Sequence, residues 1–211
     1  GRTTPRIEET RALLAAAGGC SIIDNLMSLR WAKLLVNCTF GAITSMLGCT
    51  AGDILASPEA MDFVARAADE TIRVAHACGH GLAPLQGKDL ERLLLAPGET
   101  PADKMPIYLE FFTPWAKTSG SPLQDLEMGR KTEIESLSGY LGQKGREKGI
   151  PTPANDIVLR LITEAEAAGP GRPDFATNLV RARELLRGAA SCGVLEQRDT
   201  RTALASRPPG G

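Results

Sequence analysis

The chain has 211 residues, of which 43% are hydrophobic and 23% are charged, and its formal net charge at pH 7 is -1. This composition is typical of one large globular domain, or of a domain with extensions. A nucleic-acid-binding surface is not indicated, because 24 basic residues are balanced by 25 acidic ones without a basic cluster in the ordered part. No apolar run approaches the roughly 18 to 20 residues that cross a bilayer, so we expect no membrane partner.

The start of the chain and its cysteines bear on where the protein acts. Residues 1–9 lack a basic start followed by an apolar stretch, so they do not predict a signal peptide. The cysteines form no Cys-x-x-Cys pair, which argues against a zinc knuckle or a redox pair. We expect buried structural thiols in a reducing compartment and therefore a cytoplasmic protein. The cysteines are Cys20, Cys38, Cys49, Cys78 and Cys192.

The first half of the chain reads as helical, because Ala, Leu, Glu and Arg dominate and aromatic residues make up only 4%. A short amphipathic helix is predicted over residues 5–17, and a short extended segment over 21–24. Residues 25–47 form the strongest helical pattern, with apolar side chains on nearly all sides, as in a central buried helix. Ser57 and Pro58 then begin a helix that ends near residue 78.

The second half continues this pattern with more interruptions. A short helix is expected over residues 88–95, followed by a mixture of loop and short helix over 96–122. Residues 123–148 read as a second long helix, and another helix spans 153–168. Residues 174–190 are predicted to form a last helix after a linker. The predicted fold is all-α, with two long central helices.

A polar stripe interrupts the apolar surface of the first long helix. Lys33, Asn37, Gly41 and Thr44 are spaced by four, four and three residues and therefore share one face. A glycine inside a helix costs about 1 kcal/mol relative to alanine, which is understandable where another group approaches the backbone closely. Alternatively, Lys33 extends to water at the edge of a helix and Asn37 bonds a neighbouring carbonyl group.

Glu133 borders the apolar side of the second predicted long helix. A carboxylate in this place favours a cationic partner, and Lys33 is one candidate. The alternative is a pair within the helix with Arg130, three residues earlier. An acid and an amine in one cleft can act as proton donor and orienting group, but their spacing does not name a reaction.

Two further patterns are interpreted as structural. His76 and His80 have a spacing that can bind a metal from one helical face, but Gly79 interrupts that helix and no third ligand is evident, so we predict no metal site. Glycines recur every third residue from 139 to 145 without a preceding strand. They do not form a dinucleotide-binding turn and are expected to allow close helix packing.

Two sequence blocks resemble the ketopantoate reductase (2-dehydropantoate 2-reductase) family. The first is WAKLLVNC at residues 31–38, which is similar to the Trp-x-Lys-Leu-x-x-Asn segment of that family. The second block carries matches at residues 121–125, 130–134, 138–140 and 145–155. The matches lie in order over roughly residues 1–168, and two blocks at the right separation are specific where either alone would be weak.

The resemblance implies an NADP-dependent oxidoreductase that reduces ketopantoate to pantoate in pantothenate biosynthesis. Its helical C-terminal domain, of the 6-phosphogluconate-dehydrogenase-like type, binds the 2-keto acid against a Rossmann domain that carries NADP. By this resemblance Lys33 is the general acid and stabilises the developing oxyanion. Glu133 contacts the substrate hydroxyl and the nicotinamide ribose. Ser121 contacts the substrate carboxylate, and Asn37 and Gly41 line the pocket.

The sequence departs from the family at three positions. Family members with the known substrate have Asn where this chain has Gly41, and also near Ala51 and Thr118. A site discriminates strongly through such hydrogen-bonding groups, so these departures argue against ketopantoate as the substrate but not against reductase chemistry. Residues 82–120 are also longer than is usual in the family, which suggests a remodelled cleft wall.

The expected organisation follows from the same resemblance. Residues 1–20 are predicted to be the end of a missing nucleotide-binding domain and its connector, and 21–168 the catalytic and substrate-binding domain. Residues 169–192 are predicted to be an extra C-terminal helix, and 193–211 a disordered tail. We expect a Rossmann domain in cis or in trans, without which the chain is inactive, and a homodimer is compatible with the family. The alternative is a non-catalytic dimerisation or binding module derived from that family.

Overall fold

The computed structural model describes residues 3–189 and is built from helices, as predicted. Within that range the extended pairing is limited to an isolated bridge between Leu85 and Lys88. The α-helices are α1 (Pro5–Ala15), α2 (Leu26–Val36), α3 (Ala42–Leu47), α4 (Ala51–Leu55), α5 (Pro58–Ala77), α6 (Met105–Phe112), α7 (Ser121–Glu127), α8 (Ser138–Lys148) and α9 (Pro153–Ala168). The π-helical turn η1 (Asn37–Gly41) and the 3₁₀ turns η2 (Leu90–Leu93), η3 (Pro101–Lys104), η4 (Thr113–Trp115) and η5 (Ile134–Ser136) complete the order, and residues 175–189 are also helical.

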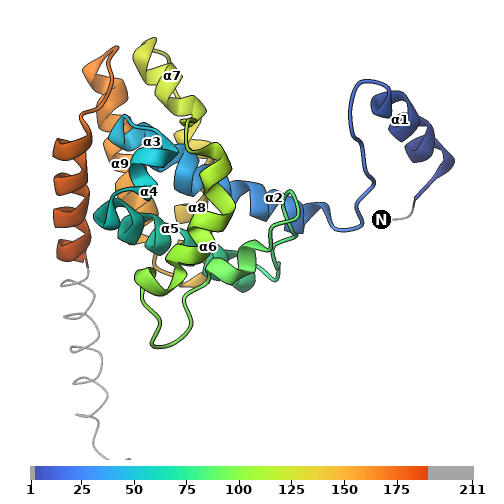
Figure 1. Ribbon diagram of the computed structural model, residues 1–211, viewed down its shortest axis with the longest axis horizontal. Helices are drawn as coiled ribbons and strands as arrows, with labels where there is room; N and C mark the ends of the chain where they lie inside the picture. The colour runs from blue at the N-terminus through green and yellow to red at the C-terminus, as the bar shows by residue number, and fades with distance from the viewer. Residues whose placement is uncertain (1–2, 190–211) are drawn as a thin grey trace, which may run out of the picture.

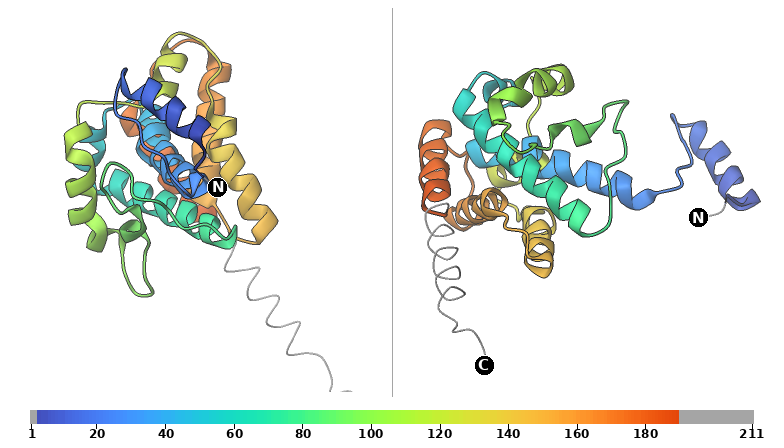
Figure 2. Two further views of the ribbon diagram at one scale, coloured as in Figure 1. Left: turned by 90° about the vertical axis from the view of Figure 1, so that its right-hand side faces the viewer. Right: turned by 90° about the horizontal axis from the view of Figure 1, so that it is seen from below.

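One composite helix forms the centre of the molecule (Figure 1). α2, η1 and α3 follow one another without a break, which confirms the helix predicted over residues 25–47. Leu35, Ile43 and Leu47 are fully buried along it. α5 packs against α2 and η1 and also contacts α8 and α9. The views in Figure 2 show the other helices arranged around this central pair.

The helix predicted over residues 123–148 is wrong, because the chain breaks into α7, η5 and α8. Gly129 adopts a left-handed conformation with φ +65° directly after α7. Its N–H donates to the carbonyl of Leu126 at 3.1 Å, and the N–H of Arg130 donates to the carbonyl of Asp125 at 2.8 Å. These two bonds form a Schellman motif, which ends a helix and redirects the chain.

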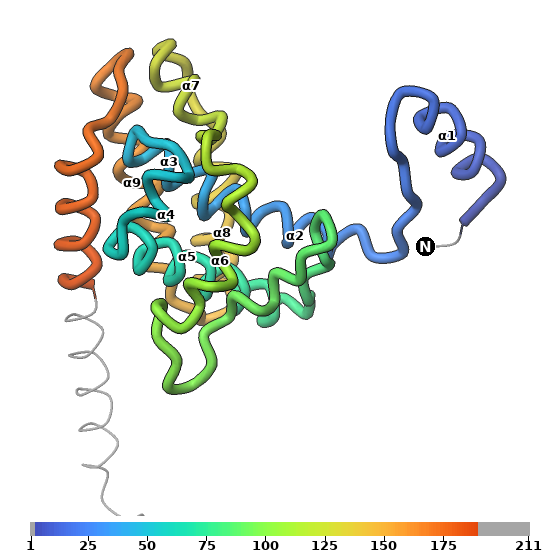
Figure 3. Tube along the Cα trace, viewed as in Figure 1, coloured from blue at the N-terminus to red at the C-terminus, as the bar shows by residue number. Residues whose placement is uncertain are grey.

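Two helices lie outside the central body. α1 stands apart from the rest of the fold in Figure 3, and each of its residues is exposed. Residues 175–189 instead pack along the body, where Asn178 Nδ2 donates to the carbonyl of Met46 at 2.7 Å and Arg181 pairs with Glu164 at 2.6 Å. The predicted tail over 193–211 lies outside the described residues. Among residues 3–189, no helix has the length and apolar character needed to cross a bilayer.

A buried carboxylate fixes the start of α9 to α5. The side chain of Glu70 is 8% exposed and accepts hydrogen bonds from the N–H groups of Ala154 (2.8 Å) and Asn155 (3.0 Å) and from Asn155 Nδ2 (2.7 Å). Burial raises the pKa of Glu70 to about 7, although the three donors act in the opposite direction. Glu70 therefore couples the stability of the fold to pH.

We predict that the melting temperature falls as pH rises from 4.5 to about 7, the interval between the ordinary and the folded pKa of Glu70. The folded state binds the proton more tightly than the unfolded state, so the stabilisation is complete below this interval and is lost as pH rises through it. Thermal unfolding followed by circular dichroism measures the slope. Glu70→Gln should flatten it, whereas Glu59→Gln at the exposed start of α5 should not. An unchanged slope in Glu70→Gln contradicts the assignment.

Candidate functional site

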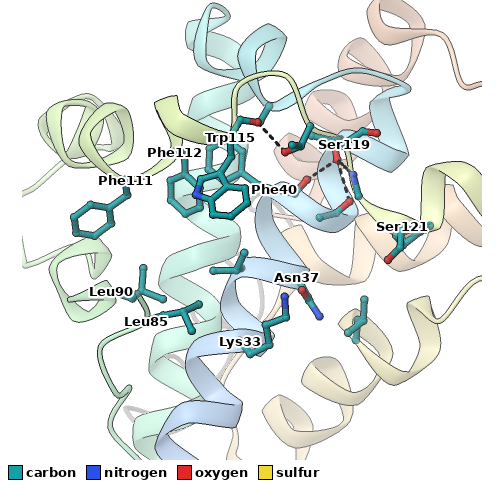
Figure 4. Close-up of a pocket in the computed structure, with 18 of the residues that line it drawn as sticks. Lys33, Asn37, Phe40, Leu85, Leu90, Phe111, Phe112, Trp115, Ser119 and Ser121 are labelled. Carbon is teal, nitrogen blue, oxygen red and sulfur yellow. Dashed lines mark hydrogen bonds between the residues drawn. The ribbon is translucent and has the colours of Figure 1, made fainter. Parts of the chain in front are cut away.

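The polar stripe of the central helix lines a cavity of about 370 Å³ (Figure 4). Lys33 lies on α2, Asn37 and Gly41 begin and end the π turn, and Thr44 lies on α3. In the π turn the N–H of Ala42 donates to the carbonyl of Asn37, five residues back. A π turn holds more residues than an α turn and is frequent at functional sites. The four residues of the stripe share one face of the composite helix and line the same cavity.

The facing wall is a loop that backbone hydrogen bonds attach to the central helix and α4. The N–H groups of Ala51 and Gly52 donate to the carbonyls of Thr118 and Ala116, both at 2.8 Å. The N–H of Gly120 donates to Thr44 Oγ1 at 2.9 Å. Both donors of α4 are groups that a helix start leaves without an internal partner. The loop is thus held mainly through its own backbone, by two bonds to α4 and one to the Thr44 hydroxyl.

The close approach expected at Gly41 occurs through its carbonyl group. A Cβ atom on Gly120 would overlap the Gly41 carbonyl, so only glycine fits at position 120. A Cβ atom on Gly41 would meet nothing closer than the Val36 carbonyl oxygen at 3.6 Å, an ordinary contact distance. Position 41 therefore accepts a side chain, and its glycine leaves open space in the cavity.

Ser121 and Glu133 complete the polar side of the cavity. Ser121 begins α7, and its Oγ donates to Glu133 Oε1 at 3.2 Å. Glu133 lies at the start of the short turn η5 rather than on a long helix. The alternative pair with Arg130 is wrong, because Arg130 binds Asp125 at 2.7 Å. Lys33 and Glu133 both line the cavity, and within residues 3–189 they form no ion pair with each other.

Two polar groups of the stripe have no partner in the described part of the chain. The side chain of Asn37 is half-buried and makes no hydrogen bond to other residues of 3–189, so the expected bond to a neighbouring carbonyl is absent there. The ammonium group of Lys33 is exposed and likewise makes no ion pair within that range. Figure 4 shows both groups pointing into the same space. The cavity therefore presents a cation and an amide to a ligand.

An apolar wall of the cavity was not predicted from the sequence. It consists of buried aromatic rings, a half-exposed indole and two leucines. These residues are Phe40, Phe111, Phe112, Trp115, Leu85 and Leu90. The sequence carries nine aromatic residues, the sum of five Phe, two Trp and two Tyr, and four of them lie within residues 108–115. The concentration of aromatic residues in this short segment, in a chain with few of them, is the sequence feature that could have predicted the wall.

The remaining candidate groups take structural positions. Cys38 and Cys49 are buried, as expected, and burial raises the pKa of each thiol to about 12, while Cys20 and Cys78 are partly exposed. Cys192 lies outside the described residues. His76 Nε2 contacts Glu91 Oε2 at 2.9 Å.

Two of the three recurring glycines of α8 allow close packing, as predicted, whereas a Cβ atom on Gly139 would meet nothing nearer than 3.7 Å. A Cβ atom on Gly142 would lie 2.6 Å from Asp156 Oδ1, and one on Gly145 would lie 2.7 Å from the Ile150 carbonyl oxygen. Both partners belong to the start of α9 or to the turn before it. These glycines therefore serve the contact between α8 and α9.

The described residues fit the nicotinamide end of a dinucleotide better than its phosphates. A dinucleotide's phosphates are usually held by a glycine-rich turn between a strand and a helix, and the range 3–189 contains no such strand. Glu133 offers an exposed carboxylate at the edge of the cavity, which can accept hydrogen bonds from ribose hydroxyl groups.

Comparison with known families gives a match over residues 25–166, to the family described as the ketopantoate reductase PanE/ApbA C-terminal domain. The match covers more than half of the chain and includes both walls of the cavity. The chain belongs to this family.

The proteins that match this ketopantoate reductase C-terminal domain are longer than it, and the matched residues make up about half of each. The 2-dehydropantoate 2-reductase of Pyrobaculum aerophilum is 28% identical over 165 residues, which are 77% of this chain and 53% of the relative. The solved 2-dehydropantoate 2-reductase of Geobacter metallireducens has a TM-score of 0.62 and 28% identity, over 78% of this chain and 50% of that one. A D-mandelate dehydrogenase solved with NADH shares the fold, with a TM-score of 0.62 and 22% identity over 78% and 51% of the two chains. The chain thus spans about half the length of the relatives it matches.

The contact of Gly120 with Gly41 gives a prediction about stability. Gly120→Ala should lower the free energy of unfolding by about 1 to 3 kcal/mol, because the added methyl group cannot fit against the Gly41 carbonyl without a backbone shift. Urea unfolding measures this change. The control is Gly139→Ala on α8, where an added Cβ would meet nothing nearer than 3.7 Å and stability should be unchanged or slightly higher. Equal stabilities of the two variants would contradict the packing described.

Proposed function

We propose that this chain is the substrate-binding and catalytic half of an NADP-dependent 2-oxo acid reductase that resembles 2-dehydropantoate 2-reductase. The observation that supports this most directly is the convergence of Lys33, Asn37, Ser121 and Glu133 on one cavity. These residues come from three separated segments of the sequence, and they are the ones for which the family resemblance implies roles. A nucleotide-binding domain, in cis or in trans, supplies the rest of the site, and the protein acts in the cytoplasm.

Lys33 is proposed to donate a proton to the carbonyl oxygen of the substrate. When bound, the cofactor supplies a hydride to the carbonyl carbon, so that a ketone, a hydride and a proton give a secondary alcohol. The positive charge of Lys33 also stabilises the negative charge that develops on the oxygen before the proton is transferred. Its lack of an ion-pair partner within residues 3–189 leaves the whole charge directed at the ligand.

The other polar residues are proposed to orient the substrate. Asn37 lies one helical turn from Lys33 and can donate its amide N–H to the carbonyl oxygen or to the carboxylate. Ser121 donates its hydroxyl to Glu133 Oε1 at 3.2 Å, and it can turn this hydroxyl to donate to the substrate carboxylate instead. Glu133 can then accept hydrogen bonds from hydroxyl groups of the ribose. Fixing the acid group and the ketone at two points holds the carbonyl carbon in one position, which favours reaction.

Lys33→Ala should lower kcat by about 10²- to 10⁴-fold in the native protein, because the variant loses its proton donor and its oxyanion-stabilising charge. NADPH oxidation with a panel of 2-oxo acids measures the effect. The matched control is Lys131→Ala, since Lys131 is exposed, pairs with Glu135 and does not line the cavity. A near-normal rate for Lys33→Ala would remove this residue from the chemistry.

The intact mass of the native protein decides how the assay is set up. A mass larger than the 22.4 kDa of this chain by a domain of roughly 100 to 200 residues places the cofactor domain in cis. A mass equal to that of this chain requires a separate nucleotide-binding chain in the assay. Failure to oxidise NADPH with any such partner, on any 2-oxo acid, would favour the non-catalytic binding module instead.

A further inference from the structure

The cavity has a polar end and an apolar end. In Figure 4, Lys33 and Asn37 lie between Ser121 on one side and Leu85, Leu90 and the rings of the aromatic wall on the other. A 2-oxo acid has the same two-part character, with an acid and a ketone at one end and a side group at the other. If the acid and ketone occupy the polar end, the side group extends toward the leucines and the aromatic rings.

The apolar end is formed by aromatic rings that pack against one another. Phe40 and Phe112 stack with their ring centroids 4.0 Å apart, and their side chains are only 6% exposed. Phe111 packs next to Phe112, at 6.5 Å between centroids. Trp115 differs from these rings, because it is 46% exposed at the rim of the cavity. A packed floor with a half-exposed indole at its edge provides apolar area that a ligand can cover.

The polar groups bordering the apolar end already have partners or face water. Lys88 pairs with Glu110 at 3.4 Å, and its ammonium group lies 5.4 Å from the centroid of the Phe111 ring. The Thr118 hydroxyl donates to the carbonyl of Trp115 at 2.7 Å. Gln86 is exposed on the turn that leads into this wall. Gln86 and Ser119 line the cavity and are exposed, so a ligand hydroxyl group near them only exchanges water for a protein partner. A hydroxyl group placed directly against the rings would find no partner, and burying it there is unfavourable.

Two small residues leave space in this part of the cavity. Gly41 contributes no side chain, although a Cβ atom would fit at that position, and Ala51 contributes a single methyl group. Both lie on the wall formed by η1 and α4. The cavity is thus wide as well as apolar, and a small ligand side chain would leave the half-exposed indole of Trp115 uncovered.

We propose that the cavity accepts 2-oxo acids with a bulky apolar side group, preferably an aromatic ring, an inference that rests on the proposed function. The acid and ketone bind at Lys33, Asn37 and Ser121, and the ring lies against Phe40, Phe112 and Trp115. Selectivity arises because a bulky apolar group covers surface that a methyl group or a hydroxylated branch leaves exposed to water.

The test compares kcat/KM for pyruvate, ketopantoate and phenylpyruvate in the native protein with its cofactor. Phenylpyruvate should exceed each of the other two by about 10-fold or more, the discrimination expected from apolar contacts in a fitted pocket. Trp115→Ala should reduce this advantage several-fold, and Trp115→Phe should retain most of it. Leu109→Ala is the control, because Leu109 is an exposed apolar residue of α6 that does not line the cavity.

A second variant fills the cavity instead of opening it. Gly41→Asn places an amide in the space beside the apolar wall, at a position where the backbone accepts a Cβ atom. It should lower kcat/KM for phenylpyruvate about 10-fold more than for pyruvate. An equal loss for both substrates would overturn the inference, since a side chain at position 41 would then not compete with the side group.

Binding can be observed without turnover. The chain has two tryptophans, and Trp31 is 3% exposed whereas Trp115 is 46% exposed. Titration with phenylpyruvate should change the fluorescence of Trp115 more than titration with pyruvate, and Trp115→Phe should remove the difference. Equal responses to the two ligands count against the inference.

The two proposals fail in different ways. If ketopantoate or pyruvate is reduced faster than phenylpyruvate, the reductase function stands and the inference about the side group is wrong. If none of the three is reduced with either NADPH or NADH, the proposed function itself fails.

Discussion

The backbone of Gly120 packs directly on the carbonyl group of Gly41, and the cavity depends on this contact. It joins two segments that are far apart in the sequence, the π turn η1 and the loop that precedes α7. Thr44 holds the contact in place, because its Oγ1 accepts the Gly120 N–H at 2.9 Å and donates to the Phe40 carbonyl at 2.6 Å. The two walls are thus fixed by the backbone of both glycines and by the Thr44 hydroxyl, so the contact does not require Lys33, Asn37 or Ser121.

The π turn explains how one helix serves both the core and the cavity. The extra residue of a π turn disturbs the regular hydrogen bonds between backbone N–H and carbonyl groups. Hydroxyl side chains near the turn donate to some of these carbonyl groups. Thr39 Oγ1 donates to the carbonyl of Leu35 at 2.7 Å, and Ser45 Oγ donates to that of Gly41 at 2.8 Å. The irregular turn is therefore satisfied from within the helix, and the Asn37 amide is not needed for that purpose.

The sequence was sufficient where local chemistry decides the structure. The cap at Ser57 and the periodicity of residues 25–47 placed two helices, and the stripe from Lys33 to Thr44 placed one wall. Residues 123–148 were predicted as one helix because the residues on both sides of Gly129 favour a helix. In the structure the Schellman hydrogen bonds at Gly129 end the first helix. The aromatic wall was missed because residues 96–122 were read as a mixture of loop and short helix, although Tyr108, Phe111, Phe112 and Trp115 follow the i, i+3, i+4, i+7 spacing of one helical face.

The arrangement of charges separates the residues that stabilise the fold from those that face the cavity. Glu70 is buried, and its carboxylate accepts three hydrogen bonds from the start of α9, so it stabilises the fold and does not face a ligand. Lys33 and Glu133 line one cavity without pairing with each other in the described chain, although a direct pair would neutralise both. A ligand placed between them gains interactions that the protein has not made internally, because Lys33 has no partner in the described chain and Glu133 accepts only the Ser121 hydroxyl. Such preorganised groups stabilise a developing charge more effectively than water does, since they need little rearrangement as the charge appears.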